Sequence, residues 1–315
     1  MEFLDAGRVV DATPWGELID AIGAELAAGN SVAPQRHVHD VPMVDGSTGA
    51  LLLMPAWTAG ELIATKVVTF FPSNAGTVVP TVNAAVLLFD GRDGRHVATI
   101  DGDELTARRT AAISALASRH LARPDSSRLL VVGTGSLAPN VARAHSHVLP
   151  ISTIEVWGRS ADKAAAVAER LASEGFDARV ATDLSQAVAQ ADLISCVTAA
   201  TSPLINGDWL APGAHLDLIG GFQHEMRESD DRAVERADVF VDTVSGATLA
   251  GDLSQPIADG WFSADDIVAD LATLARGDHA GRTSNDQITL FKSAGFAVAD
   301  LAAARLALRN ATSAG

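Results

Sequence analysis

The stretch RLLVVGTGSLAPNVARAHSHVLPISTIEVWGRS, residues 128–160, decides the fold of this chain. Its apolar run from Leu129 to Val132 is typical of a buried parallel strand. The run leads directly into GTGSLA at 133–138, where a helical pattern begins. A strand, a glycine turn and a helix in this order predict a nucleotide-binding unit of an α/β fold.

The glycine turn has the residue types that a dinucleotide needs at this place. Gly133 would permit a tight turn, Gly135 would let a pyrophosphate approach the backbone, and Ala138 would keep the helix close to the sheet. Free amides at the helix N-terminus would then face the phosphates. The pattern G-x-G-x-x-A is weak by itself, because glycine-rich turns are common, so the flanking strand and helix carry the prediction.

A second strand, Ile154 to Trp157, follows, and the tip of this strand reaches the adenosine ribose in such folds. Here the tip reads Gly158-Arg159-Ser160, without the acid that would accept hydrogen bonds from the ribose hydroxyls of NAD. Arginine and serine can instead hold the additional phosphate of NADP. We therefore predict NADPH as the cofactor, with NADH as the alternative.

The composition is that of a globular chain of two domains. Of its 315 residues, 48% are hydrophobic and 20% are charged, and the formal net charge is −16. This acidity argues against nucleic acid or an anionic membrane as a partner, since both need a basic face. A single cysteine, Cys196, excludes an internal disulfide and is expected in a buried strand. With no charged and apolar leader, and no apolar run near the roughly 20 residues of a spanning helix, we expect a cytoplasmic protein.

The first hundred residues are rich in strands and hairpins. Within the first 30 we expect a strand and then a helix, with Thr13 as N-cap and Pro14 as the first helical residue. Extended segments or strands are predicted at 31–42, 50–54, 66–71, 81–90 and 97–100, the last two joined by a hairpin. A helix at 105–122 then leads to the glycine turn.

Beyond residue 128, strands and helices alternate. We predict strands at 129–132, 154–157, 178–181, 193–198, 215–219 and 239–241, the last of them, and helices at 161–174, 184–190 and 265–276. This alternation predicts a doubly wound parallel Rossmann sheet. A final helix at 293–309 would pack back on the first domain. We assign 113–289 to the Rossmann domain, and 1–112 with 290–315 to a second, α+β domain.

Lys66 is the most informative charged residue. The chain has 20 arginines but only three lysines, and Lys66 lies in the apolar run ELIATKVVTFF, where an ammonium needs a partner or a purpose. Either it is a snorkelling residue at an edge, or, as we prefer, it faces an anion in a pocket. Arg36 and Arg109 could each grip a carboxylate; singly, a surface salt bridge explains them better, but with Lys66 they favour an anion pocket. His37 and His39 have no evident third ligand, so we expect no metal.

Five segments carry a resemblance over nearly the whole chain: IDGDELTARRTAAISALA (100–117), LLVVGTGSLA (129–138), VWGRS (156–160), ADLISCVTAATSPLINGDWLAPGAHLDLIGG (191–221) and ITLFKSAGFAVADLAAA (288–304). In these segments the chain resembles the ornithine cyclodeaminase and mu-crystallin family. Within that family, RHVHD (36–40), LLLMPAW (51–57) and LTARRTAA (105–112) are most similar to bacterial 1-pyrroline-2-carboxylate reductases, which reduce cyclic imino acids.

The resemblance implies a role for each matched residue. Arg36, Lys66 and Arg109 would surround the substrate carboxylate and the reacting carbon. Burial beside two arginines would lower the pKa of Lys66, so we expect Lys66 to supply or relay the proton. We also assign His39 and Asn83 to substrate binding. The residues implied to line the cofactor are Thr110, the turn with Gly133, Gly135, Ser136 and Leu137, and then Arg159, Ser160 and Thr198. Lys292 and Ser293 would return to the cleft, and we assign Ser293 to the cofactor together with Lys163 and Gly220. The first domain with the C-terminal helix would bind the substrate and form the interface of a homodimer.

Three positions depart from the family pattern. Phe222 stands after Gly220-Gly221, where family cyclodeaminases have a catalytic aspartate, so the acid-base group for loss of ammonia is missing. Leu137 stands where many relatives have glutamine, which removes a polar contact near the phosphates. Asn83 stands where reductase relatives tend to have histidine, which puts activity or specificity in question.

We therefore predict an NADPH-dependent oxidoreductase that acts on a C=N bond and belongs to proline metabolism. Its substrate would be a small anionic imino acid, either 1-pyrroline-2-carboxylate, giving proline, or 1-piperideine-2-carboxylate, giving pipecolate. One alternative is an ornithine cyclodeaminase, an NAD-dependent ammonia-lyase, which Phe222 and the missing ribose acid disfavour. Another is a mu-crystallin-like protein that binds NADPH or another ligand without turnover, which Asn83 keeps open.

Overall fold

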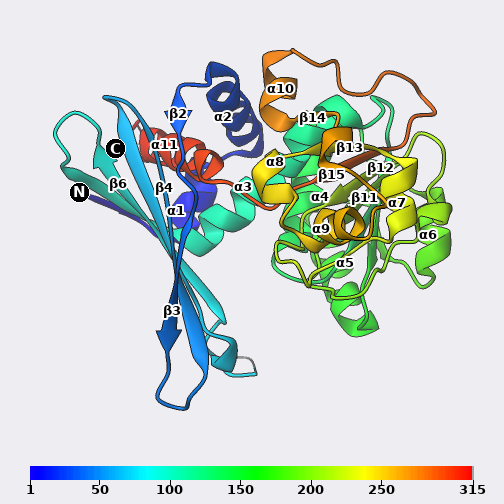
Figure 1. Cartoon of the computed structure of the whole chain (residues 1–315), viewed down its shortest axis with the longest axis horizontal. Coiled ribbons are helices and arrows are strands. Elements are labelled where there is room, and N and C mark those ends of the chain that lie inside the picture. Colours follow the sequence, from blue (N-terminus) through cyan, green and yellow to red (C-terminus); the bar gives the residue numbers. More distant parts are fainter. Residues whose placement is uncertain (75, 314–315) are drawn as a thin grey trace. The chain divides into compact units, whose positions relative to one another are not determined.

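The protein, as a computed structural model, is described over residues 1–74 and 76–313. It divides into two compact units (Figure 1): residues 1–109 with 296–315 form unit 1, and residues 110–295 form unit 2. Helix α3 (Gly102–Leu121) begins in unit 1 and ends in unit 2. In the described ranges, no helix combines the length and the apolar character needed to cross a membrane.

Unit 1 is built on a sheet of seven strands within its described residues. The strand order is β1-β7-β6-β5-β4-β2, with β3 paired to β4 outside this path. All pairs are antiparallel except β1 with β7. The strands are β1 (Glu2–Leu4), β2 (Ser31–Val32), β3 (His37–Pro42), β4 (Thr48–Thr58), β5 (Leu62–Phe70), β6 (Val82–Asp90) and β7 (His96–Asp101). The unit also contains α1 (Ala6–Ala12), α2 (Trp15–Ala28), the 3-10 turn η1 (Pro72–Asn74) and α11 (Ala297–Ser313).

The helices of unit 1 bury the faces that their sequences mark as apolar. In α2, Leu18, Ile19, Ile22 and Leu26 recur on one face and are all buried. The helix ends at Gly29, whose φ of 64° is in the left-handed region that favours glycine. The C-terminal helix α11 packs against α2 and against strands β4 and β5.

Thr13 does not have the predicted role. The N-cap of α2 is Pro14, whereas Thr13 ends α1, a helix that the sequence pattern did not predict. The Thr13 hydroxyl donates to the carbonyl of Val9 at 2.6 Å and accepts from Nε of Arg108 at 2.7 Å. The Thr13 hydroxyl oxygen, which would accept from a helix amide if Thr13 were an N-cap, accepts from the buried Arg108 instead.

Unit 2 contains a parallel sheet, which has eight strands within its described residues. The strand order is β10-β9-β8-β11-β12-β15-β13-β14. The strands are β8 (Arg128–Val132), β9 (Thr153–Trp157), β10 (Ala178–Val180), β11 (Leu193–Cys196), β12 (His215–Leu218), β13 (Asp238–Val241), β14 (Ala269–Asp270) and β15 (Thr289–Lys292). The helices are α4 (Leu137–Val148), α5 (Ala161–Ser173), α6 (Leu184–Gln190), α7 (Asp231–Arg236), α8 (Val244–Ala247), α9 (Gly251–Ala258) and α10 (Leu271–Arg276), with 3-10 turns η2 (Gly207–Trp209) and η3 (Ala264–Asp266). The predicted doubly wound parallel sheet and the buried strand position of Cys196 are confirmed.

Two predictions for the end of unit 2 are wrong. The strand at 239–241 is not the last, because β14 and β15 follow it, and β15 inserts between β12 and β13. The predicted helix at 265–276 is a 3-10 turn, a short strand and then α10. A strand as short as β15 is placed by its pairing with distant neighbours, which a local pattern does not contain.

The C-terminal helix begins four residues later than predicted, at Ala297. The residues before it bind an acid instead of continuing a helix. The amides of Ala294 and Gly295 donate to Oδ2 of Asp242 at 2.9 and 2.7 Å, and the Ser293 hydroxyl donates to the same oxygen at 2.8 Å. Gly295 has a φ of 79°.

The parallel arrangement of unit 2 gathers the carboxyl ends of its strands along one edge of the sheet. The loops after β8, β9, β11, β12 and β15 all leave from this edge. In open α/β sheets, ligands bind at this edge, next to the point where the strand order reverses. In unit 2 the order reverses between β8 and β11.

Candidate active site

Lys66 lies in the middle of the sheet of unit 1. On β5, Leu62, Ala64 and Lys66 alternate with less buried residues, so they share the buried face. The cross-strand neighbours of Lys66 are Met54 and Val86, which are also buried. Lys66 is only 3% exposed, and an ammonium in such surroundings needs a charged partner.

Asp300 on α11 is that partner. Nζ of Lys66 lies 2.9 Å from Oδ1 of Asp300 and also 2.9 Å from Oδ2. Nε of Arg109 donates to Oδ1 of the same carboxylate at 2.9 Å. All three side chains are buried. We call Lys66, Arg109 and Asp300 the Lys66 cluster; with all three ionised, two cations share one carboxylate.

The surroundings of Lys66 tune its proton affinity. Burial, and then the charges of Arg109 and Arg36, lower the pKa of Lys66 to about 8, against the opposing effect of Asp300. Burial alone would raise the pKa of Asp300, but Arg109 and Lys66 outweigh it and keep that pKa below its usual range. A lysine with a pKa near 8 can give up a proton close to neutral pH.

The sequence reasoning identified Lys66 and Arg109 but missed Asp300. A signal was present in AVADLAAA (297–304), where one carboxylate interrupts an alanine-rich apolar helix. A buried acid in such a helix needs a cation, and Lys66 was the cation in need of a partner.

His39 and Asn83 lie on the other face of the same sheet. His39 is opposite Leu51, Leu51 is opposite Thr69, and Thr69 is opposite Asn83, so the four form one row across the strands. Neighbouring residues of a strand point to opposite faces, and Thr69 is an odd number of residues from Lys66. The structure does not bring His39 and Asn83 to the Lys66 cluster, and their role in substrate binding stays a prediction.

Helix α3 carries two of the predicted site residues side by side in sequence. Arg109 is the last residue of unit 1 in this helix, and Thr110, which is half-buried, is the first residue of unit 2. The predicted substrate residue and the predicted cofactor residue are therefore consecutive in one helix.

The glycine turn after β8 has the geometry that a pyrophosphate requires. Gly133 has a φ of 132°, and a Cβ there would lie 2.8 Å from Val197, so no other residue fits without strain. A Cβ at Gly135 would meet nothing within 4 Å, which shows open space beside the turn. Within the described chain, the side chain of the exposed N-cap Ser136 forms no capping hydrogen bond, and Leu137 begins α4. The first amides of α4 thus fit a bound phosphate.

The tip of β9 carries positive charge. Arg159 is exposed and forms no ion pair with any described residue. The Ser160 hydroxyl caps α5 by accepting from the amide of Lys163 at 3.4 Å, which places the exposed Lys163 in the first turn of that helix. Two cations beside a helix N-terminus fit a phosphate group.

The remaining predicted cofactor residues are held by buried acids. The amide and hydroxyl of Thr198 donate to Glu228 at 2.6 and 2.8 Å, and the amide of Gly220 donates to the other oxygen of Glu228 at 2.9 Å. Ser293 is buried, and its hydroxyl donates to Asp242. Thr198 and Gly220 are thus brought together by Glu228, which the sequence reasoning missed, whereas Ser293 is bound to a different acid.

Known proteins resemble this chain along nearly its whole length. The sequence model of the ornithine cyclodeaminase/mu-crystallin family matches residues 3–315. A Delta(1)-pyrroline-2-carboxylate reductase of Paracoccus denitrificans is 40% identical over 303 residues, which are 95% of this chain and 94% of that protein. The mouse ketimine reductase mu-crystallin is 35% identical over 311 residues, 96% of this chain and 95% of that protein. The structure of Thermococcus litoralis Delta(1)-pyrroline-2-carboxylate reductase in complex with NADH and L-proline has a TM-score of 0.94 and 29% identity, covering 100% of this chain and 98% of that one.

Proposed function

Because the chain belongs to the ornithine cyclodeaminase/mu-crystallin family, we propose that it is an NADPH-dependent reductase of cyclic imino acids. It would convert 1-pyrroline-2-carboxylate to proline and 1-piperideine-2-carboxylate to pipecolate. The observation that carries this proposal is the buried Lys66 cluster, which combines an arginine for a carboxylate with an amine that titrates near neutral pH. Relatives named as reductases of this kind support the substrate class.

When bound, the cofactor would supply a hydride to the carbon of the C=N bond and would thereby be oxidised to NADP⁺. The imine nitrogen takes up one proton, so the product is the cyclic amino acid. The turn at Gly133 and Gly135 would hold the pyrophosphate, and Arg159 with Lys163 would hold the additional phosphate of NADPH. The related structure from Thermococcus litoralis contains NADH, so the preference for NADPH is argued from Arg159 and Lys163 of this chain.

Arg109 is suited to hold the substrate carboxylate. Among the described residues, Asp300 accepts from Nε of Arg109, and the two terminal nitrogens of the guanidinium are left for a ligand. Two parallel N–H groups match the two oxygens of a carboxylate. Arg36, whose charge acts on Lys66, would add a second cation. A fixed carboxylate also fixes the adjacent C=N carbon, which favours reaction by orientation.

Lys66 would donate the proton to the ring nitrogen. With a pKa of about 8, Lys66 is mostly protonated at neutral pH, and it is a stronger acid than a surface lysine. Asp300 holds the ammonium in place through contacts of 2.9 Å. The neutral amine left after proton transfer would remain beside Asp300 until it is reprotonated.

We also propose that the chain forms a homodimer through the open face of the sheet in unit 1. Leu53, Val67 and Leu87 lie on the face opposite Lys66, and each is only partly buried. Leu53 and Val67 are directly opposite each other on neighbouring strands. A run of partly exposed apolar side chains across a sheet is typical of a surface that another chain covers.

The reductase is tested by oxidation of NADPH, followed as loss of the absorbance of the reduced nicotinamide. The reaction is run with each of the two imino acids, then with NADH, and separately with ornithine and NAD. We expect rapid oxidation of NADPH by at least one imino acid. Proline formed from ornithine, without imine reduction, would contradict the proposal and favour a cyclodeaminase. NADPH binding without turnover of any substrate would favour a ligand-binding protein.

The cofactor preference is tested by Arg159→Ala. Removing one charge-assisted contact to the additional phosphate should raise KM for NADPH about tenfold or more and leave KM for NADH unchanged. Arg170→Ala, which removes an exposed arginine of α5 in the same unit, is the matched control. Equal changes for both cofactors in Arg159→Ala would contradict the assignment of Arg159.

A further inference from the structure

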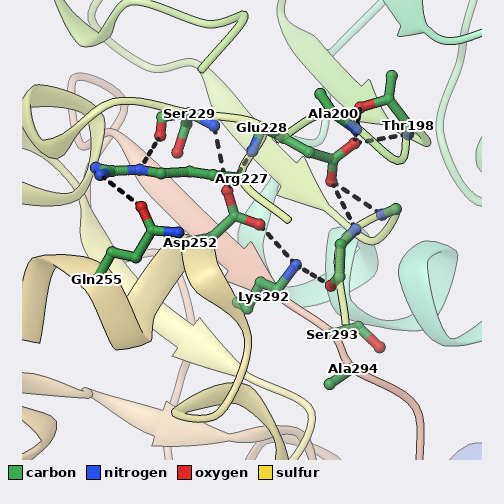
Figure 2. Close-up of polar contacts among 12 residues, drawn as sticks. Thr198, Ala200, Arg227, Glu228, Ser229, Asp252, Gln255, Lys292, Ser293 and Ala294 are labelled. Carbon is green, nitrogen blue, oxygen red and sulfur yellow. Dashed lines mark hydrogen bonds and ion pairs between the residues drawn. The ribbon is translucent and has the colours of Figure 1, made fainter. Parts of the chain in front are cut away.

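Unit 2 contains a second buried cluster of charges, separate in sequence from the Lys66 cluster. It consists of Glu228, Asp252 and Lys292, and each side chain is 0% exposed. Figure 2 shows how they are linked by hydrogen bonds and an ion pair. We call them the Glu228 cluster. Neither Glu228 nor Asp252 was identified from the sequence as a residue that binds the cofactor or the substrate.

Glu228 ties together two loops at the carboxyl edge of the sheet. Its Oε1 accepts from the amide and the hydroxyl of Thr198, at 2.6 and 2.8 Å. Its Oε2 accepts from the amides of Gly220 and Gly221, at 2.9 and 3.3 Å. Thr198 belongs to the loop after β11, and the two glycines belong to the loop after β12. One carboxylate therefore satisfies four donors from two neighbouring loops (Figure 2).

Asp252 and Lys292 hold the backbone around Glu228 and Gly221 in place, and we call this pair of residues the brace. Oδ1 of Asp252 accepts from the amides of Glu228 and Ser229, at 2.7 and 3.2 Å. Nζ of Lys292 donates to Oδ2 of Asp252 at 2.8 Å and to the carbonyl of Gly221 at 2.6 Å. Lys292 is the last residue of β15, so the brace connects the two loops to a third strand of the sheet.

The order of the strands places these loops on the nicotinamide side of the cofactor. The glycine turn that would hold the pyrophosphate follows β8, and the cationic tip that would hold the adenosine phosphate follows β9. In the sheet, β8 has β9 on one side and β11, then β12, on the other. A dinucleotide crosses the sheet edge at the reversal of strand order. Its nicotinamide half would then lie over the loops after β11 and β12.

We propose that Glu228 is a positioning residue for the nicotinamide half of the cofactor, because its carboxylate fixes the two loops against which the nicotinamide would lie. This inference rests on the proposed cofactor of the reductase. Gly220 supports it, since a Cβ at this position would collide with the backbone of Thr198. The two loops are thus packed tightly against each other, and Glu228 holds them in register.

The charges of the cluster agree with such a role. Burial, and then the charge of Asp252, raise the pKa of Glu228 to about 7, while Lys292 and the donors from Thr198 oppose this rise. Burial opposes the charge of Lys292, but Asp252 and Glu228 outweigh it and raise the pKa of that lysine. Two acids around one cation are costly to bury, which argues for a purpose beyond the stability of the fold.

The experiment compares two ligands on the full chain. One is NADPH, and the other is 2′-phospho-ADP-ribose, which has the same adenosine phosphate and pyrophosphate but no nicotinamide. In Glu228→Gln, the amide keeps the shape of the side chain but presents N–H groups to N–H donors, so the loops should lose their arrangement. We expect Kd for NADPH to rise about tenfold or more and Kd for 2′-phospho-ADP-ribose to stay within about twofold. Glu174→Gln, at a partly exposed carboxylate bonded to Arg143 in the same unit, is the matched control.

The outcomes separate this inference from the proposed function, because binding is measured without any imino acid. Equal binding of NADPH by Glu228→Gln and the wild type, or an equal loss for both ligands, would overturn the positioning role. If Glu228→Gln does not fold, Asp252→Asn is used, which loosens the brace and keeps the Glu228 carboxylate. A selective loss for NADPH is expected there too, and its absence would overturn the role. A wild-type chain that binds neither NADPH nor NADH would overturn the proposed function, and this inference with it.

Discussion

Asp300 determines how Lys66 and Arg109, both buried in unit 1, can act. Without a carboxylate, Lys66 and Arg109 would repel each other, and Lys66 would lose its proton more easily. With Asp300 at 2.9 Å from both, Lys66 keeps a pKa of about 8. The same carboxylate occupies Nε of Arg109 and thereby orients the guanidinium. One acid therefore sets both the protonation of Lys66 and the direction of Arg109.

This arrangement predicts the pH dependence of turnover. If protonated Lys66 is the proton donor, kcat/KM should fall as the pH rises through about 8. In Asp300→Asn, the carboxylate that raises the pKa of Lys66 is gone, so this basic limb should move to lower pH. The pH profile of kcat/KM is measured for the wild type, for Asp300→Asn and for Asp11→Asn, an exposed acid of unit 1. A basic limb at the same pH in Asp300→Asn and the wild type would refute the role of Asp300.

The contribution of Lys66 to the stability of the folded chain should increase over the pH range in which turnover falls. The pKa of Lys66 is about 8 in the folded state and near the ordinary value of 10.5 in the unfolded state. Between these two values the unfolded chain binds the additional proton, so the contribution of Lys66 to stability increases as the pH rises through this window. At lower pH the folded chain bears the free-energy cost of burying the charged ammonium. That cost falls as the pH rises through about 8, where we also expect kcat/KM to fall.

The sequence was more informative about the cations than about the acids. Lys66 could be identified because the chain has only three lysines, and one in an apolar strand is conspicuous. The apolar run AVADLAAA marks Asp300, but Glu228 and Asp252 belong to a set of 39 acidic residues, so neither attracts notice. Their importance comes from burial and from partners that are far away in sequence, which only the fold reveals.

At the scale of the elements, the two glycines in the turn between β8 and α4 meet different structural requirements. Gly133 is required by its backbone, with a φ of 132° and a close approach to Val197. Gly135 has no such requirement, since a Cβ there would point into open space. The two glycines of one motif therefore have different reasons to be glycine, a difference that the sequence pattern does not show.

The variants Gly135→Ala and Gly133→Ala test this difference. Gly135→Ala should fold with a Tm within about 2 °C of the wild type, but bind NADPH about tenfold more weakly, because the methyl group occupies the space of the pyrophosphate. Gly133→Ala, the comparison variant, should lose about 1–3 kcal/mol of unfolding free energy through backbone strain. Tm and Kd for NADPH are measured for both. Unchanged NADPH binding by Gly135→Ala would show that the phosphates do not approach this turn.

The elements that could be predicted are those whose pattern is local. The alternation on β5 and the helical face of α2 are visible in the residues themselves. The position of β15 is not, because its four residues are defined by pairing with β12 and β13. The predicted start of the last helix was also wrong for a distant reason, since Asp242 binds Ser293, Ala294 and Gly295 at that position.

For the whole molecule, the two faces of the sheet in unit 1 carry different sets of residues. One face carries Lys66 and is covered by α11 through Asp300. The other carries Leu53, Val67 and Leu87, together with His39 and Asn83. Strand alternation places Lys66 on the first face and these partly buried apolar residues on the second. A second copy of the chain is the partner that we propose.

The proposed dimer predicts the effect of a charge on the open face. Val67→Lys places an ammonium in the centre of this face, where a covering chain would have to desolvate it. We expect sedimentation to show a monomer for Val67→Lys and a dimer for the wild type. Val244→Lys, at an exposed valine of unit 2, is the control and should stay dimeric. A wild-type monomer, or a dimer in Val67→Lys, would contradict an interface on this face.

The most direct test of the central claim is a single-turnover measurement with Lys66→Met. Methionine keeps the length of the side chain and removes the proton, while Arg109 still accompanies Asp300. With 1-pyrroline-2-carboxylate, we predict an unchanged Kd for NADPH and a rate of NADPH oxidation reduced about 100-fold or more. Lys66→Arg, which keeps a cation but does not release a proton, should be similarly slow. Oxidation by Lys66→Met at the wild-type rate would contradict the assignment of Lys66 as proton donor.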